Sequence, residues 1–127
     1  MQDFKTFQDF LLFYQMTEEI NTKILHFFEN IEKYYGSKTE ITEGLYSLTE
    51  SFDSHSTTWN LSEFILVRSG YRKTGERLMI EGEKMYYEIS AALLVNFEQK
   101  GRNSFEFVEK YGDSVFRVTK ITFQYKY

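Results

Sequence analysis

Residues 85–97, MYYEISAALLVNF, form the most apolar long stretch of the chain, and their pattern limits the possible folds more than any other feature. Every odd position in the stretch is apolar or aromatic: Met85, Tyr87, Ile89, Ala91, Leu93, Val95 and Phe97. The even positions include the polar residues Glu88, Ser90 and Asn96. A buried face of a β-sheet requires such an alternation with a period of two. The segment therefore predicts one long strand.

A helix is the competing interpretation of the same residues. Apolar side chains at positions 85, 89, 93 and 97 also follow helical spacing, and Ala91–Ala92 favours a helix locally. A helix would scatter Tyr87, Leu94 and Val95 around its circumference, so we predict the strand. The second face of this strand is also partly apolar, and we expect another element to cover it.

The first third of the chain predicts helices. Apolar residues recur at helical spacing between residues 20 and 35: Ile20, Ile24, Phe27, Phe28, Ile31, Tyr34 and Tyr35. Thr17 is a suitable N-cap and Gly36 a suitable residue after the last turn. A preceding helix is predicted from Phe4 to Gln15, and the two can run together. A third helix is predicted from Glu40 to Phe52, although Gly44 weakens it.

The pattern changes to that of strands after a polar loop, DSHSTT, at residues 53–58. The run LSEFILVRSG crowds apolar and β-branched residues and predicts a strand. The following RKTGER predicts a turn, and LMI opens a second short strand that ends at Gly82.

The C-terminal segment FEFVEKYGDSVFRV predicts a hairpin with a two-residue Gly112-Asp113 loop. This loop pairs Phe107 with Val118 and Glu109 with Phe116, which puts phenylalanines on one face and most charged residues on the other. Beyond Lys120 the apolar positions change from even to odd. A bulge near residues 119–121, or a different partner for the last strand, would explain the change.

Taken together, these elements predict an α+β fold in which N-terminal helices pack on a curved antiparallel sheet of four to five strands. The 127 residues suit a single domain covering residues 1–127. Aromatic residues make up 19% of the chain, enough for a core of large side chains or for a core and a lined pocket. The chain has no Cys, which excludes disulfides, thiolate metal sites and a cysteine nucleophile.

Charge is distributed unevenly along the chain. The net charge is −4, which argues against nonspecific nucleic-acid binding. Four basic residues lie within ten positions: Arg68, Arg72, Lys73 and Arg77. They predict a solvated hairpin loop, with an anionic ligand or nucleic acid as the alternative. The N-terminus lacks a basic signal-peptide region and no apolar run is long enough to span a membrane, so we expect a cytoplasmic protein.

Two short segments resemble the nuclear-transport-factor-2-like superfamily, also called SnoaL-like or cystatin-like. IEGEKMYYEIS resembles the family's Gly-acid turn that leads into a long strand, and YGDSVFRVTK is similar to its closing hairpin. Trp is more usual where Phe116 stands, and the order Gly112-Asp113 is inverted relative to the family. The resemblance implies a cone-shaped pocket between the helices and a concave sheet face, frequent homodimers, and both enzymes and binding proteins as relatives.

Candidate chemical groups are few. Asp53 and His55 in the loop are the only weak catalytic candidates, while His26 falls on the polar side of its helix. Ligand spacing for a metal is missing, and no cofactor is predicted. If a pocket exists, the candidate ligand-binding residues are Tyr14, Tyr34, Trp59 and Tyr87, although ordinary packing in an aromatic core explains each of them better.

The sequence therefore predicts a noncatalytic module that binds a small apolar ligand or another protein. A homodimer formed through one sheet face is the expected assembly, and a strand from Val115 to Tyr127 could also accept another chain at its edge. The alternative is a small isomerase, dehydratase or cyclase that uses the cone-shaped pocket. We expect neither a nucleic-acid partner nor a membrane.

Overall fold

One long helix precedes a series of antiparallel strands. The computed structural model describes the backbone of residues 7–47 and 58–124, and the side chains of residues 18–47 and 59–124. Along the chain the elements are α1 (Phe7–Asn30), the 3-10 turn η1 (Ile31–Tyr34), β1 (Lys38–Ser47), β2 (Thr58–Ile65), β3 (Arg68–Arg72), β4 (Arg77–Glu81), β5 (Tyr86–Ser90), the 3-10 turn η3 (Ala91–Leu93), β6 (Leu94–Gly101), β7 (Ser104–Tyr111) and β8 (Val115–Gln124). These elements make an α+β fold.

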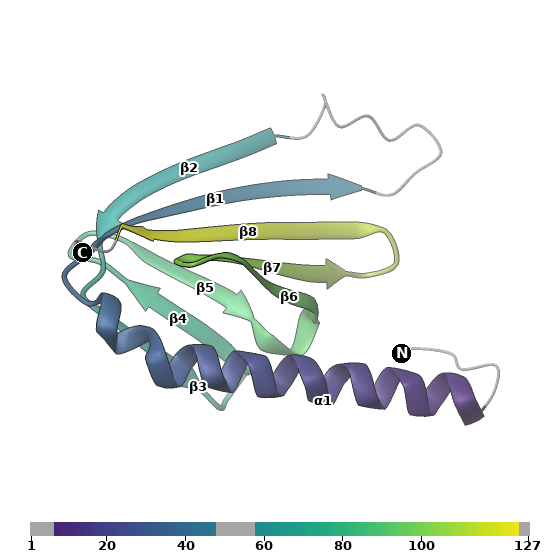
Figure 1. The fold of residues 1–127 in the computed structure, drawn as a ribbon. Helices are drawn as coiled ribbons and strands as arrows, with labels where there is room; N and C mark the ends of the chain where they lie inside the picture. Colours follow the sequence, from purple (N-terminus) through teal and green to yellow (C-terminus); the bar gives the residue numbers. More distant parts are fainter. Residues whose placement is uncertain (1–6, 48–57, 125–127) are drawn as a thin grey trace.

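The strands form two sheets. In the described part of the chain, a five-stranded sheet has the order β2-β1-β8-β7-β6, and a three-stranded sheet has the order β3-β4-β5. The chain passes from one sheet to the other at two adjacent residues after β2. The amide of Leu66 donates to Ser37 O at 3.0 Å, beside β1, whereas the amide of Val67 donates to Glu81 O at 2.8 Å, on β4. It returns through η3, between β5 and β6 (Figure 1).

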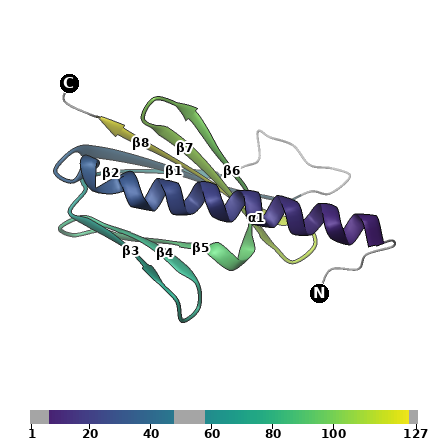
Figure 2. The same cartoon turned by 60° about the horizontal axis from the view of Figure 1, so that its bottom comes forward.

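Helix α1 packs across the two sheets and closes the core (Figure 2). Phe27 lies at the centre of this core, with its ring 4.7 Å from that of Phe105 and 5.5 Å from that of Phe107. The three-stranded sheet contributes Leu78, Ile80 and Ile89, each about 1% exposed. Burying large aromatic and branched side chains on both sheets and on the helix supplies most of the stabilisation of such a fold.

The N-terminal helical prediction is right in its location, and the two predicted helices do run together, but the N-cap predicted at Thr17 is wrong. The two helices expected at the N-terminus form the single helix α1, and Thr17 lies inside it and not at an N-cap. The side chains on the face that turns inward include Ile24 and Phe27, as the spacing predicts. Gly36 does adopt a positive φ of 87°, which ends the helical segment after η1.

The third predicted helix is wrong over residues 40–47, because Lys38–Ser47 forms strand β1, and residues 48–52 lie outside the described residues. This strand pairs with β2 on one side and β8 on the other, so it lies inside the sheet. Thr39 and Ile41 alternate into the core, at 0% and 1% exposure. The pairing available on both sides outweighs the local helical spacing of the apolar residues, which is a weak preference.

The single strand predicted over residues 85–97 is also wrong. Strand β5 ends at Ser90, η3 occupies Ala91–Leu93, and β6 begins at Leu94 in the other sheet. The inward positions Tyr87, Ile89 and Phe97 do contact the core. The long alternation is therefore the sum of two strands that belong to different sheets, joined by a turn at the alanines. The stretch LSEFILVRSG divides in the same way between β2 and β3.

The C-terminal hairpin exists, but its register differs from the prediction. Tyr111 pairs with Val115, so the loop has three residues, and Glu109 pairs with Arg117. The β7–β8 register runs without a break from Ser104 to Tyr111, so the bulge predicted near residues 119–121 is absent from this ladder. Strand β8 lies between β1 and β7, which corrects the prediction that it is an edge strand.

The β3–β4 hairpin follows the sequence prediction, with its turn at residues 73–76. The strand that contains Leu78–Ile80 ends at Glu81, just before Gly82, as expected. In the part of the chain that the structure describes, no helix combines the length and the apolar character needed to cross a membrane.

Candidate functional site

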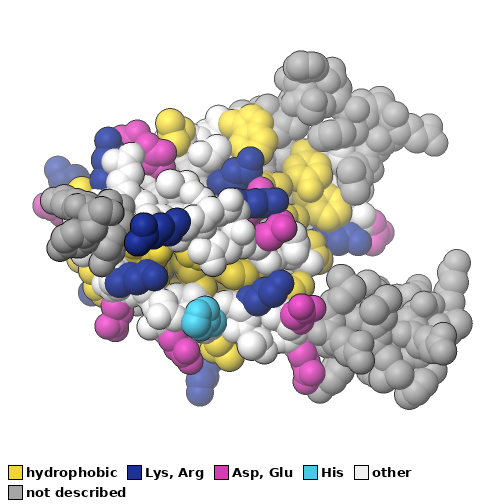
Figure 3. Space-filling view, viewed as in Figure 1, with side chains coloured by type: hydrophobic (Ala, Val, Ile, Leu, Met, Phe, Trp, Pro, Cys, Tyr) yellow, Lys and Arg dark blue, Asp and Glu magenta, His cyan; other side chains and the backbone are white. Residues whose placement is uncertain are grey.

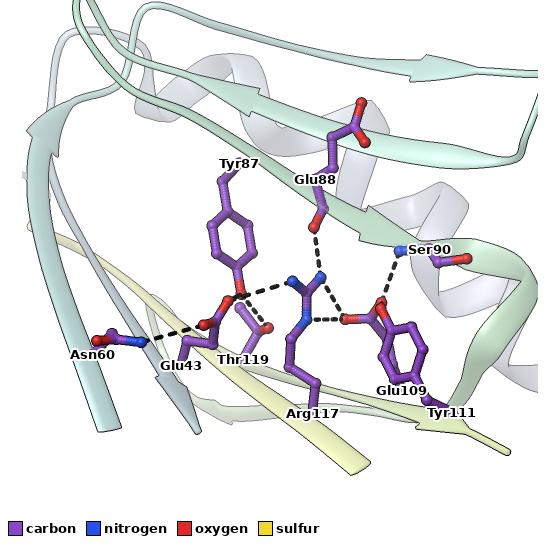
Figure 4. Close-up of polar contacts among 9 residues, drawn as sticks. All are labelled: Glu43, Asn60, Tyr87, Glu88, Ser90, Glu109, Tyr111, Arg117 and Thr119. Atoms are coloured by element: carbon purple, nitrogen blue, oxygen red, sulfur yellow. Dashed lines mark hydrogen bonds and ion pairs between the residues drawn. The ribbon is translucent and has the colours of Figure 1, made fainter. Parts of the chain in front are cut away.

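A polar network links the facing surfaces of the two sheets (Figure 4). The larger sheet contributes Glu43 from β1, Glu109 from β7, and Arg117 and Thr119 from β8. The smaller sheet contributes Tyr87, the backbone oxygen of Glu88 and the backbone amide of Ser90, all from β5. Buried charged groups are expensive unless they are paired and hydrogen-bonded, so the geometry of each member decides what this network can do.

Arg117 is the centre of the network, with its side chain 19% exposed. Its Nε donates to Glu109 Oε1 at 2.8 Å, and its Nη2 lies 2.7 Å from the same oxygen. Nη2 also donates to Glu88 O at 2.6 Å, and Nη1 donates to Glu43 Oε2 at 3.3 Å. Every nitrogen of the guanidinium therefore has a partner.

The electrostatic surroundings keep Arg117 charged. Burial lowers the pKa of Arg117, but the facing Tyr87 and the Glu109 carboxylate outweigh that effect and raise it above its ordinary value. The guanidinium carbon also lies 5.1 Å from the centre of the Tyr87 ring, a distance that permits a cation–π contact.

Glu109 is fully buried and has a complete set of donors. Besides Arg117, its Oε2 accepts from the Ser90 amide at 2.9 Å and from the Tyr111 hydroxyl at 2.6 Å. Burial and this hydrogen bond to Glu109 raise the pKa of Tyr111 to about 12. Glu109 is thus a structural anion that connects β7 to β5 and leaves no lone pair directed at an open space.

Glu43 is the most accessible carboxylate of the network, with its side chain 23% exposed. Its Oε2 accepts from the Tyr87 hydroxyl at 3.0 Å, and its Oε1 accepts from Asn60 Nδ2 at 3.5 Å. The Tyr87 hydroxyl also lies 2.7 Å from Thr119 Oγ1. Burial raises the pKa of Tyr87 well above its ordinary value, so this phenol stays neutral at physiological pH.

Aromatic and aliphatic side chains occupy the opposite, outer face of the five-stranded sheet. Trp59 pairs with Gly44, and a Cβ added at Gly44 would lie only 2.5 Å from the indole ring. Lys120 Nζ lies 5.7 Å from the centre of the same ring. Farther along, the rings of Tyr46 and Phe116 stack at 5.2 Å. Gly44 therefore lets Trp59 lie flat over β1.

Strand β2 carries most of the exposed apolar surface of this face. Trp59, Leu61 and Ile65 are 47%, 64% and 52% exposed. In Figure 3, hydrophobic side chains reach the surface at the end of the molecule where Figure 1 draws the start of β2.

An open depression of about 440 Å³ lies on the same sheet over β6, β7 and β8, lined by Lys100, Ser104, Phe105, Glu106, Lys120 and Thr122. Lys100 and Lys120 both lie 4.0 Å from Glu106, and Lys100 also lies 2.8 Å from Glu98, so each of these lysines has a carboxylate partner.

The structure separates the residues predicted to line a pocket. Tyr87 belongs to the polar network, and Trp59 lies on the outer face of the sheet. Tyr34 is 2% exposed in the core, where its ring stacks on Phe123 at 4.1 Å and its hydroxyl donates to Asn103 at 3.0 Å. Tyr34, Trp59 and Tyr87 therefore do not converge on one site.

The remaining residues that the sequence singled out provide less evidence for a functional site. The Tyr14 side chain, Asp53 and His55 lie outside the described residues. His26 is exposed on α1, as predicted, and its neighbour is Asn30. Among the described residues, no group of three or more His, Asp or Glu side chains is arranged to hold a metal ion.

Three of the four basic residues of the β3–β4 hairpin lie beside acidic residues. Arg68 forms two hydrogen bonds with Glu81, at 2.6 and 3.1 Å. Arg72 and Arg77 each lie 3.7 Å from a Glu88 carboxylate oxygen. These pairs agree with a solvated hairpin, because Arg68, Arg72 and Arg77 each lie beside a carboxylate of the same chain.

Sequence reasoning missed Glu43, Glu109 and Arg117. The predicted two-residue loop paired Glu109 with Phe116 and not with Arg117, and Glu43 fell in the predicted third helix. The signal that could have identified two of them is the hairpin loop length, because a three-residue loop sets Glu109 directly opposite Arg117.

Comparison with known proteins gives no match: no protein-family model, curated protein or solved structure is similar to this chain.

Proposed function

We propose that this protein is a noncatalytic interaction module that associates with a second copy of itself through the β2 side of the five-stranded sheet. The observation that carries the proposal is the exposure of Trp59, Leu61 and Ile65 along one strand. Contiguous exposed apolar side chains on a soluble protein mark interaction surfaces more often than scattered ones do. Trp is also the residue type most enriched among those that dominate binding energy.

The interior supports a noncatalytic role. All guanidinium nitrogens of Arg117 and both carboxylate oxygens of Glu109 are engaged within the chain. A catalytic acid or base needs a proton position that reaches a substrate. The network instead joins β5 to β7 and β8, and this accounts for its charges without a reaction.

Membership of the nuclear-transport-factor-2-like superfamily remains part of this proposal. The order of a helix before an antiparallel sheet favours it. As a more specific part of the same proposal, the sheet is curved, and its concave face holds a small apolar ligand against the helix. The separate three-stranded sheet and the single N-terminal helix are departures from the layout that the resemblance implies.

The test is the mass of the purified protein in solution, measured by sedimentation velocity over a wide concentration range. We expect the wild type to dimerise and the Leu61→Asp variant to remain monomeric. Leu25→Asp is the matched control, because Leu25 on α1 is 63% exposed and Leu61 is 64% exposed. A wild type that stays monomeric at every concentration, or a Leu61→Asp variant that dimerises normally, would refute the proposal.

A second candidate function is a small isomerase, dehydratase or cyclase, and the observation that favours it is the Glu43–Tyr87 pair. Glu43 is partly accessible, is held by Tyr87 and Arg117, and is the one carboxylate of the network able to reach a ligand. Native mass spectrometry would detect a retained small molecule, and Glu43→Gln should then release it. Equal retention by wild type and variant would remove Glu43 from any such site.

A further inference from the structure

The β2 edge differs from the other sheet edges of the described chain. Edge strands normally carry features that prevent pairing with another chain, such as bulges, charges or short length. Strand β6 has two register irregularities and packs beside α1. Strands β3 and β5 are only five residues long. Strand β2 has eight residues and keeps an unbroken register with β1.

The backbone of β2 presents donors and acceptors along this edge. The Leu66 amide donates to Ser37 O, and the Leu66 carbonyl accepts from the Gly36 amide, so the polar groups of Leu66 point toward the β1 side. Backbone groups alternate direction along an antiparallel strand. Those of Trp59, Leu61, Glu63 and Ile65 therefore point away from β1. The Val67 amide, which turns to β4, agrees with this alternation.

We propose that β2 pairs antiparallel with β2 of a second copy around a two-fold axis at Ser62, which rests on the self-association proposed above. In this register Trp59 lies opposite Ile65 of the second copy, and Leu61 lies opposite Glu63. All four outward-pointing residues of each strand then find a partner. Because each hydrogen-bonded pair exchanges two bonds, the junction gains roughly eight backbone hydrogen bonds.

Charge and side-chain chemistry favour this register for the pairing with a second copy. Glu63 is the only charged residue among the four, and Lys38 of its own chain binds it at 3.1 Å. Moving the register by two residues in one direction would oppose Glu63 with itself, and moving it in the other would oppose Glu63 with Trp59. The proposed register avoids both, and it makes an aromatic–β-branched cross-strand pair at each end, a stabilising combination.

A single introduced cysteine tests the register, because the chain has no Cys of its own. Ser62 would face its own copy in a non-hydrogen-bonded pair, with Cα atoms about 4.5 Å apart, which is within disulfide range. We expect Ser62→Cys to form a disulfide-linked dimer under mild oxidation. Asn60→Cys is the control on the same side of the strand, because its copies would lie about 13 Å apart.

A second variant tests the backbone bonds. Leu61→Pro removes an N–H that points to the free edge and no bond to β1. Each copy then loses one intermolecular hydrogen bond, so we expect the dimer to weaken roughly 30-fold. A circular dichroism spectrum and a melting temperature that match those of the wild type would verify that the Leu61→Pro variant is folded.

The outcomes separate this inference from the proposed function. A Ser62→Cys protein that stays uncrosslinked while the wild type sediments as a dimer overturns the β2 pairing and leaves self-association standing. An Asn60→Cys protein that crosslinks as readily as Ser62→Cys also overturns the register. A wild type that is monomeric at all concentrations refutes both.

Discussion

Replacing Arg117 with Met tests whether the polar network stabilises the junction between the two sheets. Methionine keeps a long unbranched side chain but lacks every guanidinium donor. Glu109 would then lose the contacts at 2.7 and 2.8 Å while remaining fully buried. Its carboxylate would retain only the Ser90 amide and the Tyr111 hydroxyl. The variant therefore leaves a buried anion without its counter-charge.

The expected loss is large. Removing one partner of a buried ion pair typically costs about 3–5 kcal/mol, a substantial part of the roughly 5–15 kcal/mol that stabilises a domain. For a chain of this length, each kcal/mol corresponds to roughly 4 °C in melting temperature. We therefore expect Arg117→Met to lower the melting temperature by roughly 12–20 °C.

Urea unfolding measures this loss, and two further proteins interpret it. The double variant Glu109→Met/Arg117→Met also removes the fully buried Glu109 carboxylate, so it should be more stable than Arg117→Met alone. Arg68→Met is the matched control, because Arg68 also binds a carboxylate through two nitrogens but has a side chain 69% exposed. Its removal should change the stability far less than Arg117→Met does, because solvent screens an exposed ion pair. Similar losses for Arg117→Met and Arg68→Met, or strictly additive losses in the double variant, would refute the reasoning.

Three further predictions follow from the packing and the titration of single residues. Gly44→Ala should lower the free energy of unfolding by about 1–3 kcal/mol and shift the fluorescence emission of the chain's one Trp, because the new methyl group overlaps the indole. Gly70→Ala is its control and should leave the emission unchanged, because a Cβ there meets only Met79 at 3.4 Å. Phe27→Ala should cost about 3–5 kcal/mol in urea unfolding, because it empties the centre of the aromatic core, whereas Leu25→Ala should change stability by less than about 0.5 kcal/mol. The pKa of Tyr111 is raised from 10.0 to about 12, so its contribution to stability is complete below pH 10 and is lost as the pH rises toward 12. Tyr111→Phe should therefore lose less stability between pH 10 and pH 12 than the wild type does, and an equal loss would contradict the raised pKa.

The sequence predicts an element well where one periodicity persists within one packing environment. The helical spacing of Ile24 and Phe27 identifies the buried face of α1, and Gly36 marks where the helical segment ends. The prediction fails where the chain changes sheet. At Leu66–Val67 and again at residues 91–93, the chain leaves one sheet and enters the other. The alternation of apolar residues continues across both points and does not indicate which sheet a residue belongs to.

The β1 prediction fails for a different reason. Apolar residues spaced three or four apart fit a helix, but β1 has a partner strand along each edge and contributes Thr39 and Ile41 to the core. Those partners are distant in sequence, so local spacing cannot include their contribution. Gly44, which weakened the predicted helix, is required for the close approach of Trp59 from β2.

The pairing of Glu109 with Arg117 was missed because the sequence predicted a two-residue hairpin loop, although the chain contains evidence against that loop. With a two-residue loop, the apolar positions change parity beyond Lys120 and demand a bulge. With a three-residue loop, Phe105 lies opposite Ile121 and all the apolar odd positions of β7 and β8 share one face without a bulge. The same shift turns Glu109 and Arg117 inward together, which is tolerable only because they are directly opposed and neutralise each other. The apparent change of parity was therefore a signal that the loop has three residues, which is the register in which Glu109 and Arg117 form an internal ion pair.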